Sequence, residues 1–208
     1  MSKRIKTVVI TGGSCSGKTT TVKWLRQKFG EPAVVYVPEA ATLLLKGGFP
    51  APKIDVPMNR KWQESFQKAV AAVQLEMEDM YREVARRRGA QLMICDRGLL
   101  DGAAYLPGGI NKFCALCQLD LPEIIKRYDL VIHLESLATA DPKKYGRSNN
   151  HHRFESLKEA RYLEFKTRRA WKCHPYRLIY WRYPNSSRDD RLGELENIAK
   201  QIESLLQL

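Results

Sequence analysis

The stretch Gly12-Gly13-Ser14-Cys15-Ser16-Gly17-Lys18-Thr19 fits the pattern G-x-x-x-x-G-K-[ST] of a phosphate-binding loop. The β-branched run at residues 6–11 before it predicts a buried strand. Residues 20–29 after it carry apolar side chains at helical spacing, and Gly30 predicts the end of that helix. A strand, a glycine-rich loop and a helix in this order direct backbone N–H groups and the positive end of the helix dipole at one point. The stretch therefore predicts a site for the phosphates of a nucleotide, against the alternative of a chance glycine-rich turn.

Individual roles follow for the residues of this loop. The cradle for the nucleotide is expected to comprise Gly12, Gly13, Ser14, Cys15, Ser16, Gly17, Lys18, Thr19 and Thr20. Within it, the ammonium of Lys18 is expected to reach the β- and γ-phosphates, and the hydroxyl of Thr19 to ligate Mg²⁺.

Composition places the chain among soluble globular proteins. It has 208 residues, of which 44% are hydrophobic and 28% charged, and this suits one domain over residues 1–208. No apolar run approaches the roughly 18 residues that span a bilayer, and the short N-terminal run leads directly into the phosphate loop rather than resembling a signal peptide. We therefore expect a cytoplasmic protein whose five cysteines are free thiols. The net charge of +12 indicates polyanionic partners, although solvated helix faces account for much of it.

The order of the predicted elements indicates the fold class. Further strands are expected at residues 33–37, 91–95, 129–135 and 177–183, with a long amphipathic helix at 59–88 and another at about 189–206. Strands that alternate with helices form a parallel sheet covered on both faces. The prediction is an α/β, three-layer P-loop NTPase fold with a five-stranded parallel sheet, whose ligands bind outside the carboxyl ends of the strands.

Polar residues of catalytic type follow the predicted strands. Asp96 is expected to hold Mg²⁺ beside Thr19, with helix capping as the alternative. Arg97 suits recognition of a phosphate or carboxylate, with a buried ion pair as the alternative. Glu39 would accept a proton from a hydroxyl that attacks the γ-phosphate, or it is merely an acid in the first turn of a helix. The sequence does not distinguish between these two roles of Glu39.

The most polar region of the chain predicts a mobile, arginine-rich lid at about residues 136–170. Arg153 and Arg161 are eight positions apart, close to two helical turns, so that both could face the nucleotide. Arg153 would then stabilise the charge of the phosphoryl group during transfer, and closure would exclude water. The alternative is a solvated basic helix with a flexible start.

Taken together, these motifs resemble the P-loop kinase-like ATPases. The segments Val37-Pro38-Glu39-Ala40-Ala41 and Asp96-Arg97-Gly98-Leu99-x-Asp101, with Tyr105, look like the nicotinamide riboside kinase-type AAA ATPase/kinase domains, and more distantly like deoxynucleoside and thymidylate kinases. The resemblance implies that Glu39 is a base, that Gln67 presents its amide to a nucleobase, and that Asp96 and Arg97 serve metal and phosphate. It implies a substrate site of Glu39, Gln67, Arg97, Asp101 and Tyr105. Deoxynucleoside kinases usually carry Glu-Arg-Ser in place of Asp96-Arg97-Gly98, so the acceptor stays open.

Function is therefore expected to be transfer of a γ-phosphoryl group from ATP, with Mg²⁺, to a small nucleoside- or nucleotide-like metabolite. The alternative is an NTP-binding or NTP-hydrolysing regulatory protein that engages an acidic partner without a small-molecule acceptor. A kinase acting on nucleic-acid ends is the weakest reading, because no aromatic–basic sheet motif or zinc finger supports it; nucleic acid is thus not an expected partner. ATP is favoured over GTP because Asn111-Lys112-Phe113-Cys114 lacks the aspartate of Asn-Lys-x-Asp. The sequence carries no signal for the oligomeric state.

Overall fold

A five-stranded, all-parallel sheet forms the centre of the molecule. The computed structural model describes residues 4–145, 155–183 and 186–207. Its strands stand in the order β2-β3-β1-β4-β5, so the phosphate loop leaves from the central strand. They are β1 (Lys6–Thr11), β2 (Val34–Val37), β3 (Leu92–Asp96), β4 (Leu130–Leu134) and β5 (Arg177–Tyr180). The predicted α/β fold with a five-stranded parallel sheet is confirmed.

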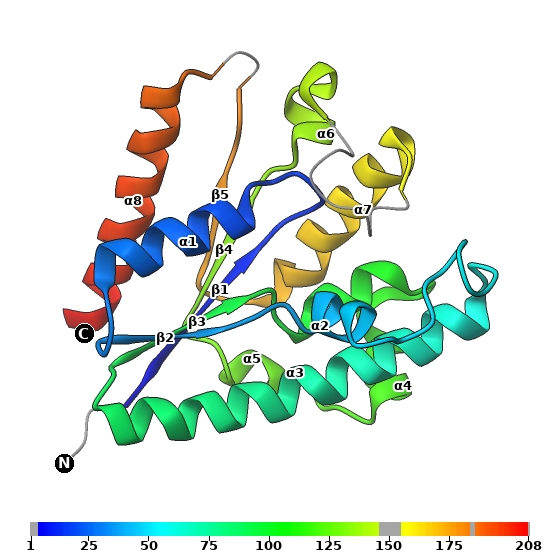
Figure 1. Ribbon diagram of the computed structural model, residues 1–208, viewed down its shortest axis with the longest axis horizontal. Coiled ribbons are helices and arrows are strands. Elements are labelled where there is room, and N and C mark those ends of the chain that lie inside the picture. Colours follow the sequence, from blue (N-terminus) through cyan, green and yellow to red (C-terminus); the bar gives the residue numbers. More distant parts are fainter. Residues whose placement is uncertain (1–3, 146–154, 184–185, 208) are drawn as a thin grey trace.

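Helices cover both faces of this sheet (Figure 1). On one face, α1 (Lys18–Phe29) and α8 (Arg188–Gln207) pack on an apolar cluster that includes Leu25 and Ile198. On the other face, a second cluster joins Ala71, Phe113 and Trp171. The elements of this second layer are α3 (Arg60–Arg88), α4 (Gly109–Cys117), α5 (Leu121–Lys126), α7 (Leu157–Ala170) and the 3₁₀ turns η1 (Leu99–Tyr105) and η3 (Trp171–Cys173). Short connections complete the chain: α2 (Ala40–Lys46), α6 (Leu137–Ala140) and η2 (Pro142–Lys144).

The strands and the long helix form where the local pattern predicts them. Val8, Val9 and Ile10 are fully buried, as expected for a strand covered on both faces. Helix α3 begins after Asn59, whose side chain accepts a hydrogen bond from the N–H of Trp62 at 2.9 Å, and it ends at Gly89, whose φ of 67° lies in the left-handed region.

One predicted segment differs from the structure, and another is described only in part. Strand β5 ends at Tyr180 rather than near residue 183, because its only neighbour β4 ends at the paired residue Leu134. Within the predicted lid at 136–170, residues 157–170 form α7, in which Ala160 and Glu164 are buried. This part of the segment is therefore a packed helix, whereas Arg153 lies outside the described residues. No helix in the described part of the chain has the length and apolar character needed to cross a bilayer.

Candidate active site

The phosphate loop lies above the carboxyl end of the sheet and is shaped by close backbone contacts. Gly12 has a φ of 138°, and a Cβ there would collide with the carbonyl oxygen of Leu134 at the end of β4. Only glycine fits such a position, because it lacks a Cβ and tolerates positive φ. The loop is thus held directly against the neighbouring strand.

Lys18 points back into the loop that precedes it. Its ammonium donates to the carbonyl oxygens of Gly12 at 2.9 Å and Gly13 at 2.7 Å, and to Oγ of Ser16 at 3.2 Å. Burial, together with the nearby guanidinium of Arg97, lowers the pKa of Lys18 to about 8. The side chain is therefore still mostly charged at neutral pH and lies where a phosphate group would meet it.

Side chains from the ends of β2 and β3 meet beside this lysine. Arg97 donates from Nε to Oε1 of Glu39 at 2.5 Å, and from Nη1 to Oδ1 of Asp101 at 2.9 Å and to the carbonyl oxygen of Gly12 at 3.2 Å. Thr42 donates to the other oxygen of Glu39 at 2.5 Å. The guanidinium of Arg97 therefore bridges the predicted base and the phosphate loop, which is the buried ion pair that the sequence left as an alternative.

The pKa values of the neighbouring carboxyl groups of Glu39 and Asp96 are shifted in opposite directions. Burial alone would raise the pKa of Glu39, but Arg97 and Lys18 outweigh it and lower this pKa to about 2. Burial raises the pKa of Asp96 to about 6, and the negative charge of Glu39 adds to that increase. A divalent cation bound near Asp96 would favour its ionised form, as Lys18 and Arg97 already do.

The donor set of Asp96 and Thr19 fits a divalent cation. Oδ1 of Asp96 is buried and, among the described residues, has no hydrogen-bond partner. Asp96 does not cap the turn that follows, because the N-cap of η1 is Gly98. Thr19 is exposed in the first turn of α1 and lines the same cavity as Lys18. Carboxylate and hydroxyl oxygens are the ligands that Mg²⁺ prefers, so these residues suit it.

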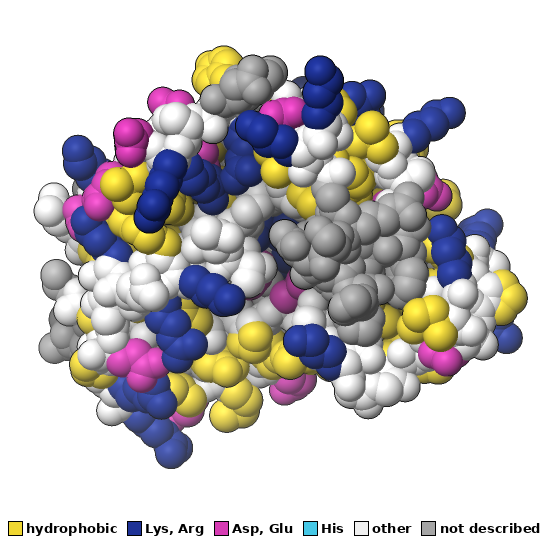
Figure 2. Space-filling model, turned by 45° about the horizontal axis from the view of Figure 1, so that its top comes forward, with side chains coloured by type: hydrophobic (Ala, Val, Ile, Leu, Met, Phe, Trp, Pro, Cys, Tyr) yellow, Lys and Arg dark blue, Asp and Glu magenta, His cyan; other side chains and the backbone are white. Residues whose placement is uncertain are grey.

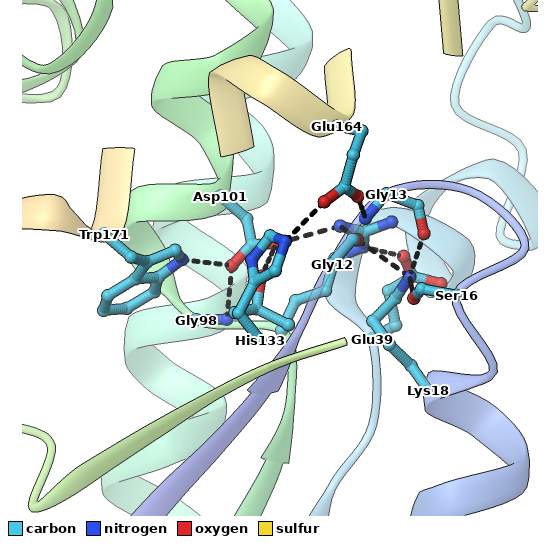
Figure 3. A network of polar contacts seen from close by, with 12 residues as sticks. Gly12, Gly13, Ser16, Lys18, Glu39, Gly98, Asp101, His133, Glu164 and Trp171 are labelled. Atoms are coloured by element: carbon cyan, nitrogen blue, oxygen red, sulfur yellow. Dashed lines mark hydrogen bonds and ion pairs between the residues drawn. The ribbon is translucent and has the colours of Figure 1, made fainter. Parts of the chain in front are cut away.

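Asp101 holds neighbouring residues of the site in place through hydrogen bonds. Its Oδ1 accepts from Oγ1 of Thr11 at 2.7 Å and from Arg97, and its Oδ2 accepts from Nε1 of Trp171 at 3.0 Å and the N–H of Gly98 at 3.2 Å (Figure 3). A carboxylate has about four acceptor positions, and protein donors take all of them here. The geometry therefore gives Asp101 a positioning role, whereas the predicted contact with substrate stays a prediction.

A cavity of about 190 Å³ opens from the phosphate loop between α2, α3, η1 and α4. Figure 2 shows this side of the molecule, with a hollow near the centre of the view and Lys and Arg side chains around it. The rings of Trp62 and Phe66 stack in the wall at 4.8 Å between centroids. Every predicted substrate residue lines this cavity together with Lys18 and Thr19: Glu39, Gln67, Arg97, Asp101 and Tyr105. The cavity therefore joins an aromatic wall to the polar residues beside the phosphate loop.

Glu164 is a site residue that sequence reasoning missed. Its Oε2 accepts the N–H of Gly13 at 2.7 Å, and its Oε1 lies 2.6 Å from Nε2 of the fully buried His133 (Figure 3). The hydrogen bond from His133 helps to lower the pKa of Glu164 against the effect of burial. Helix α7 is thus attached to the phosphate loop. In the sequence, only the paired glycines at 12 and 13 could have indicated that another element approaches the loop this closely.

Arg182 was also missed, because residues 177–183 were read as strand. A Cβ added to Gly17 would lie 2.5 Å from Nη2 of Arg182 and 2.9 Å from Nη2 of Arg191. Burial and the charge of Arg191 lower the pKa of Arg182, whose buried Nε has no partner among the described residues. Arg191 donates to Oγ1 of Thr21 at 2.7 Å. Two guanidinium groups beside the loop make this end of the site suited to a polyanion.

Comparison with known proteins agrees with this geometry. A family model described as "AAA domain" matches residues 7–191, a span that contains the phosphate loop, the strand-end residues, α7 and Arg182. A search of curated proteins finds no match.

Proposed function

The chain belongs to the AAA domain family of P-loop NTPases, and from this premise we propose that it is a kinase. The proposed reaction moves the γ-phosphoryl group of ATP, with Mg²⁺, to a hydroxyl of a small nucleoside- or nucleotide-like metabolite. We expect it to act in the cytoplasm. One observation carries the proposal: the carboxylate of Glu39 borders a cavity that also reaches Lys18 and Thr19.

Each site residue has a role in this reaction. Lys18 neutralises charge on the β- and γ-phosphates, and Thr19 and Asp96 would hold Mg²⁺, which offsets phosphate charge when bound. An acceptor hydroxyl oxygen forms the new bond to phosphorus, the bond to the ADP oxygen breaks, and the hydroxyl proton passes to Glu39. Arg97 orients Glu39 through their 2.5 Å hydrogen bond. The guanidinium of Arg182 lies close enough to Gly17 to add a further contact to the phosphates.

The pKa of Glu39 is compatible with this role. A carboxylate with a pKa of about 2 is ionised at neutral pH, which is the state that can accept a proton. It is a weak base, but phosphoryl transfer has a loose transition state in which positioning and charge stabilisation dominate. Glu39 is therefore proposed chiefly to orient the hydroxyl.

The walls of the cavity support an acceptor larger than water. Trp62, Phe66 and Phe113 supply apolar surface, and Gln67, only 3% exposed, supplies an amide at the same wall. Sites for small organic ligands combine an apolar lining with a few polar groups in this way. A site for hydrolysis alone would not need an aromatic chamber next to the loop. The predicted acceptor contacts of Gln67 and Tyr105 belong to this proposal.

A nucleotide-dependent regulatory protein is the second candidate. It is favoured by cations of α7 and β5 that lie away from the cavity, among them Arg168, Arg169 and Arg177. In that case nucleotide would bind, but no metabolite would increase its turnover.

Release of ADP from Mg²⁺-ATP in the presence of a metabolite library tests the proposal. At least one hydroxyl-bearing metabolite is expected to raise the rate, and Lys18→Ala serves as the inactive control. Glu39→Gln should reduce the stimulated rate by about 10²-fold, the cost of a misplaced acceptor hydroxyl. Glu203→Gln, at an exposed position of α8, controls for loss of a carboxylate. Stimulation that survives in Glu39→Gln refutes the role of Glu39, and the absence of any stimulating metabolite favours the regulatory protein.

A further inference from the structure

A groove remote from the cavity is lined by cations. It lies between α7 with η3 on one side and β5 on the other, and it encloses about 600 Å³. Its lining consists of Phe165, Arg168, Arg169, Lys172, Arg177, Ile179 and Trp181. Four of these residues are cationic, and no acidic residue is among them.

The charges of the groove are not neutralised within the described part of the protein. None of the four cations forms an ion pair with a described residue. Arg177 donates to the backbone carbonyl oxygen of Arg168 at 2.7 Å, which leaves its charge uncompensated. Two other basic residues of α7 likewise donate to backbone carbonyl oxygens, Arg161 to that of Ala138 and Lys166 to that of Leu106. The groove therefore brings together four cations that have no ion-pair partner among the described residues.

Aromatic side chains stand among these cations. Trp181 is 50% exposed and Phe165 is 48% exposed. The guanidinium carbon of Arg168 lies 4.8 Å from the centre of the Trp181 ring, within the range of a cation–π contact. Exposure of large apolar rings to water is unfavourable. Rings that neighbouring cations hold in place at the surface suit a ligand that has both charge and flat apolar faces.

The groove also follows the free edge of the sheet. Strand β5 is the last in the order, and Figure 1 shows the chain reaching it from α7 by a short turn. Side chains alternate along a strand, so Arg177 and Ile179 face the same side, and Trp181, just after the strand, lines the groove with them. The result is a surface of charge and aromatic rings beside a strand that, among the described residues, is paired on one side only. An extended chain can lie along such an edge.

We propose that this groove binds single-stranded nucleic acid, with phosphates contacting the cations and bases stacking on Trp181 and Phe165. Single strands are bound by this pairing of a positive groove with aromatic platforms, because every base has a stacking face. An acidic peptide would match the charge but would leave the aromatic rings without flat partners. The site does not depend on the proposed kinase activity.

Fluorescence anisotropy with a labelled dT15 oligonucleotide tests the proposal. Arg168→Ala/Arg169→Ala should weaken binding at 50 mM KCl by about tenfold or more, since two phosphate contacts are lost. The plot of log K against log salt should become less steep by about 1.4, which is twice the single-strand value of about 0.7 for one contact. Arg86→Ala/Arg87→Ala removes the same charge from exposed positions on α3 and should leave binding nearly unchanged.

Stacking is tested separately through tryptophan fluorescence. The oligonucleotide should quench the wild-type protein, Trp181→Ala should lose most of that quenching and affinity, and Trp181→Phe should retain much of the affinity. Unchanged thermal unfolding shows that each variant is folded. The proposal is overturned if dT15 does not bind, if both double variants weaken binding equally, or if duplex DNA binds as tightly as dT15. Binding of phosphatidylglycerol vesicles or poly-glutamate without binding of dT15 overturns it in favour of a membrane or an acidic protein.

Discussion

Gly13 shows how a single residue can depend on a helix far away in the chain. A Cβ on Gly13 would lie 2.7 Å from Oε2 of Glu164 and 3.3 Å from its Cα. The second contact involves backbone, which cannot rotate away as a side chain can. Gly13 is therefore needed for the approach of α7 as well as for the path of the loop.

Gly13→Ala is expected to destabilise the protein by about 1–3 kcal/mol and to weaken nucleotide binding, because α7 must move or the hydrogen bond to Glu164 must break. Urea unfolding and calorimetry with ATP measure the two effects. Gly193→Ala is the matched control: it lies inside α8 with no atom within 4 Å of an added Cβ, and it should stabilise by about 0.5–1 kcal/mol. If both alanines behave alike, the proximity of α7 is unimportant.

The ion pair of Glu39 gives a prediction for acid stability. Because the pKa of Glu39 in the folded protein is about 2, below its ordinary value of 4.5, the ionised form stabilises the fold at neutral pH. That contribution is at most about 3 kcal/mol, is complete above pH 4.5, and is lost as the pH falls toward 2. Wild type should therefore exceed Glu39→Gln in free energy of unfolding at pH 7, and the difference should shrink at pH 4 and 3. A difference independent of pH would contradict the ion pair; Glu203→Gln, at an exposed position of α8, is the control.

Among the elements, α3 supports the site through a buried polar stripe, which consists of Gln74 and Glu78 of α3 together with Tyr128. Nε2 of Gln74 donates to Oε1 of Glu78 at 2.9 Å and to the carbonyl oxygen of Arg97 at 3.3 Å. The hydroxyl of Tyr128 donates to the same oxygen of Glu78 at 2.8 Å and accepts the N–H of Leu99 at 3.0 Å. Arg97 has a φ of 73°, an uncommon conformation for a residue with a side chain. The stripe holds the turn after β3 in this conformation.

Tyr128→Phe is expected to cost about 1–3 kcal/mol of stability, because the buried N–H of Leu99 loses its partner. It should also lower turnover, since the turn that carries Arg97 is less well held. Thermal unfolding and the ADP-release assay measure these effects. Tyr180→Phe removes a hydroxyl that bonds Asn197 at an exposed position and should cost less than 1 kcal/mol. Equal losses in the two variants would show that the stripe does not support the site.

For the whole molecule, ligand binding links the layers on the two faces of the sheet. The phosphate loop connects the central strand to α1, touches β4 through Gly12 and touches α7 through Gly13. A ligand held there resists unfolding of all these elements together. Stability should therefore follow occupancy of the site.

Mg²⁺-ATP at about 100 times its Kd is expected to stabilise the protein by about 2.7 kcal/mol, or roughly 5–10 °C in Tm. Lys18→Ala should lose most of the shift, and addition of EDTA should reduce it. Thermal scans with ATP, Mg²⁺-ATP and ATP with EDTA provide the comparison. If millimolar Mg²⁺-ATP leaves the Tm of the wild type unchanged, the proposed nucleotide site is wrong.

The sequence by itself determined the features that depend on neighbouring residues. The phosphate loop, the strands and the long helix from 60 to 88 follow from spacing, side-chain type and capping, all of which are local. The carboxyl ends of parallel strands necessarily share one edge, so the cavity that joins Lys18, Glu39 and Asp101 could also be expected.

Only the tertiary structure decided how these groups pair. It places Arg97 on Glu39, closes the acceptor positions of Asp101, brings Glu164 to Gly13, and sets Arg168 over Trp181. Each contact joins side chains from different elements, and its strength depends on distances of a few ångströms and on the loss of water around charges. Those distances are set by the order of the strands and the packing of α3 and α7, which no local pattern encodes.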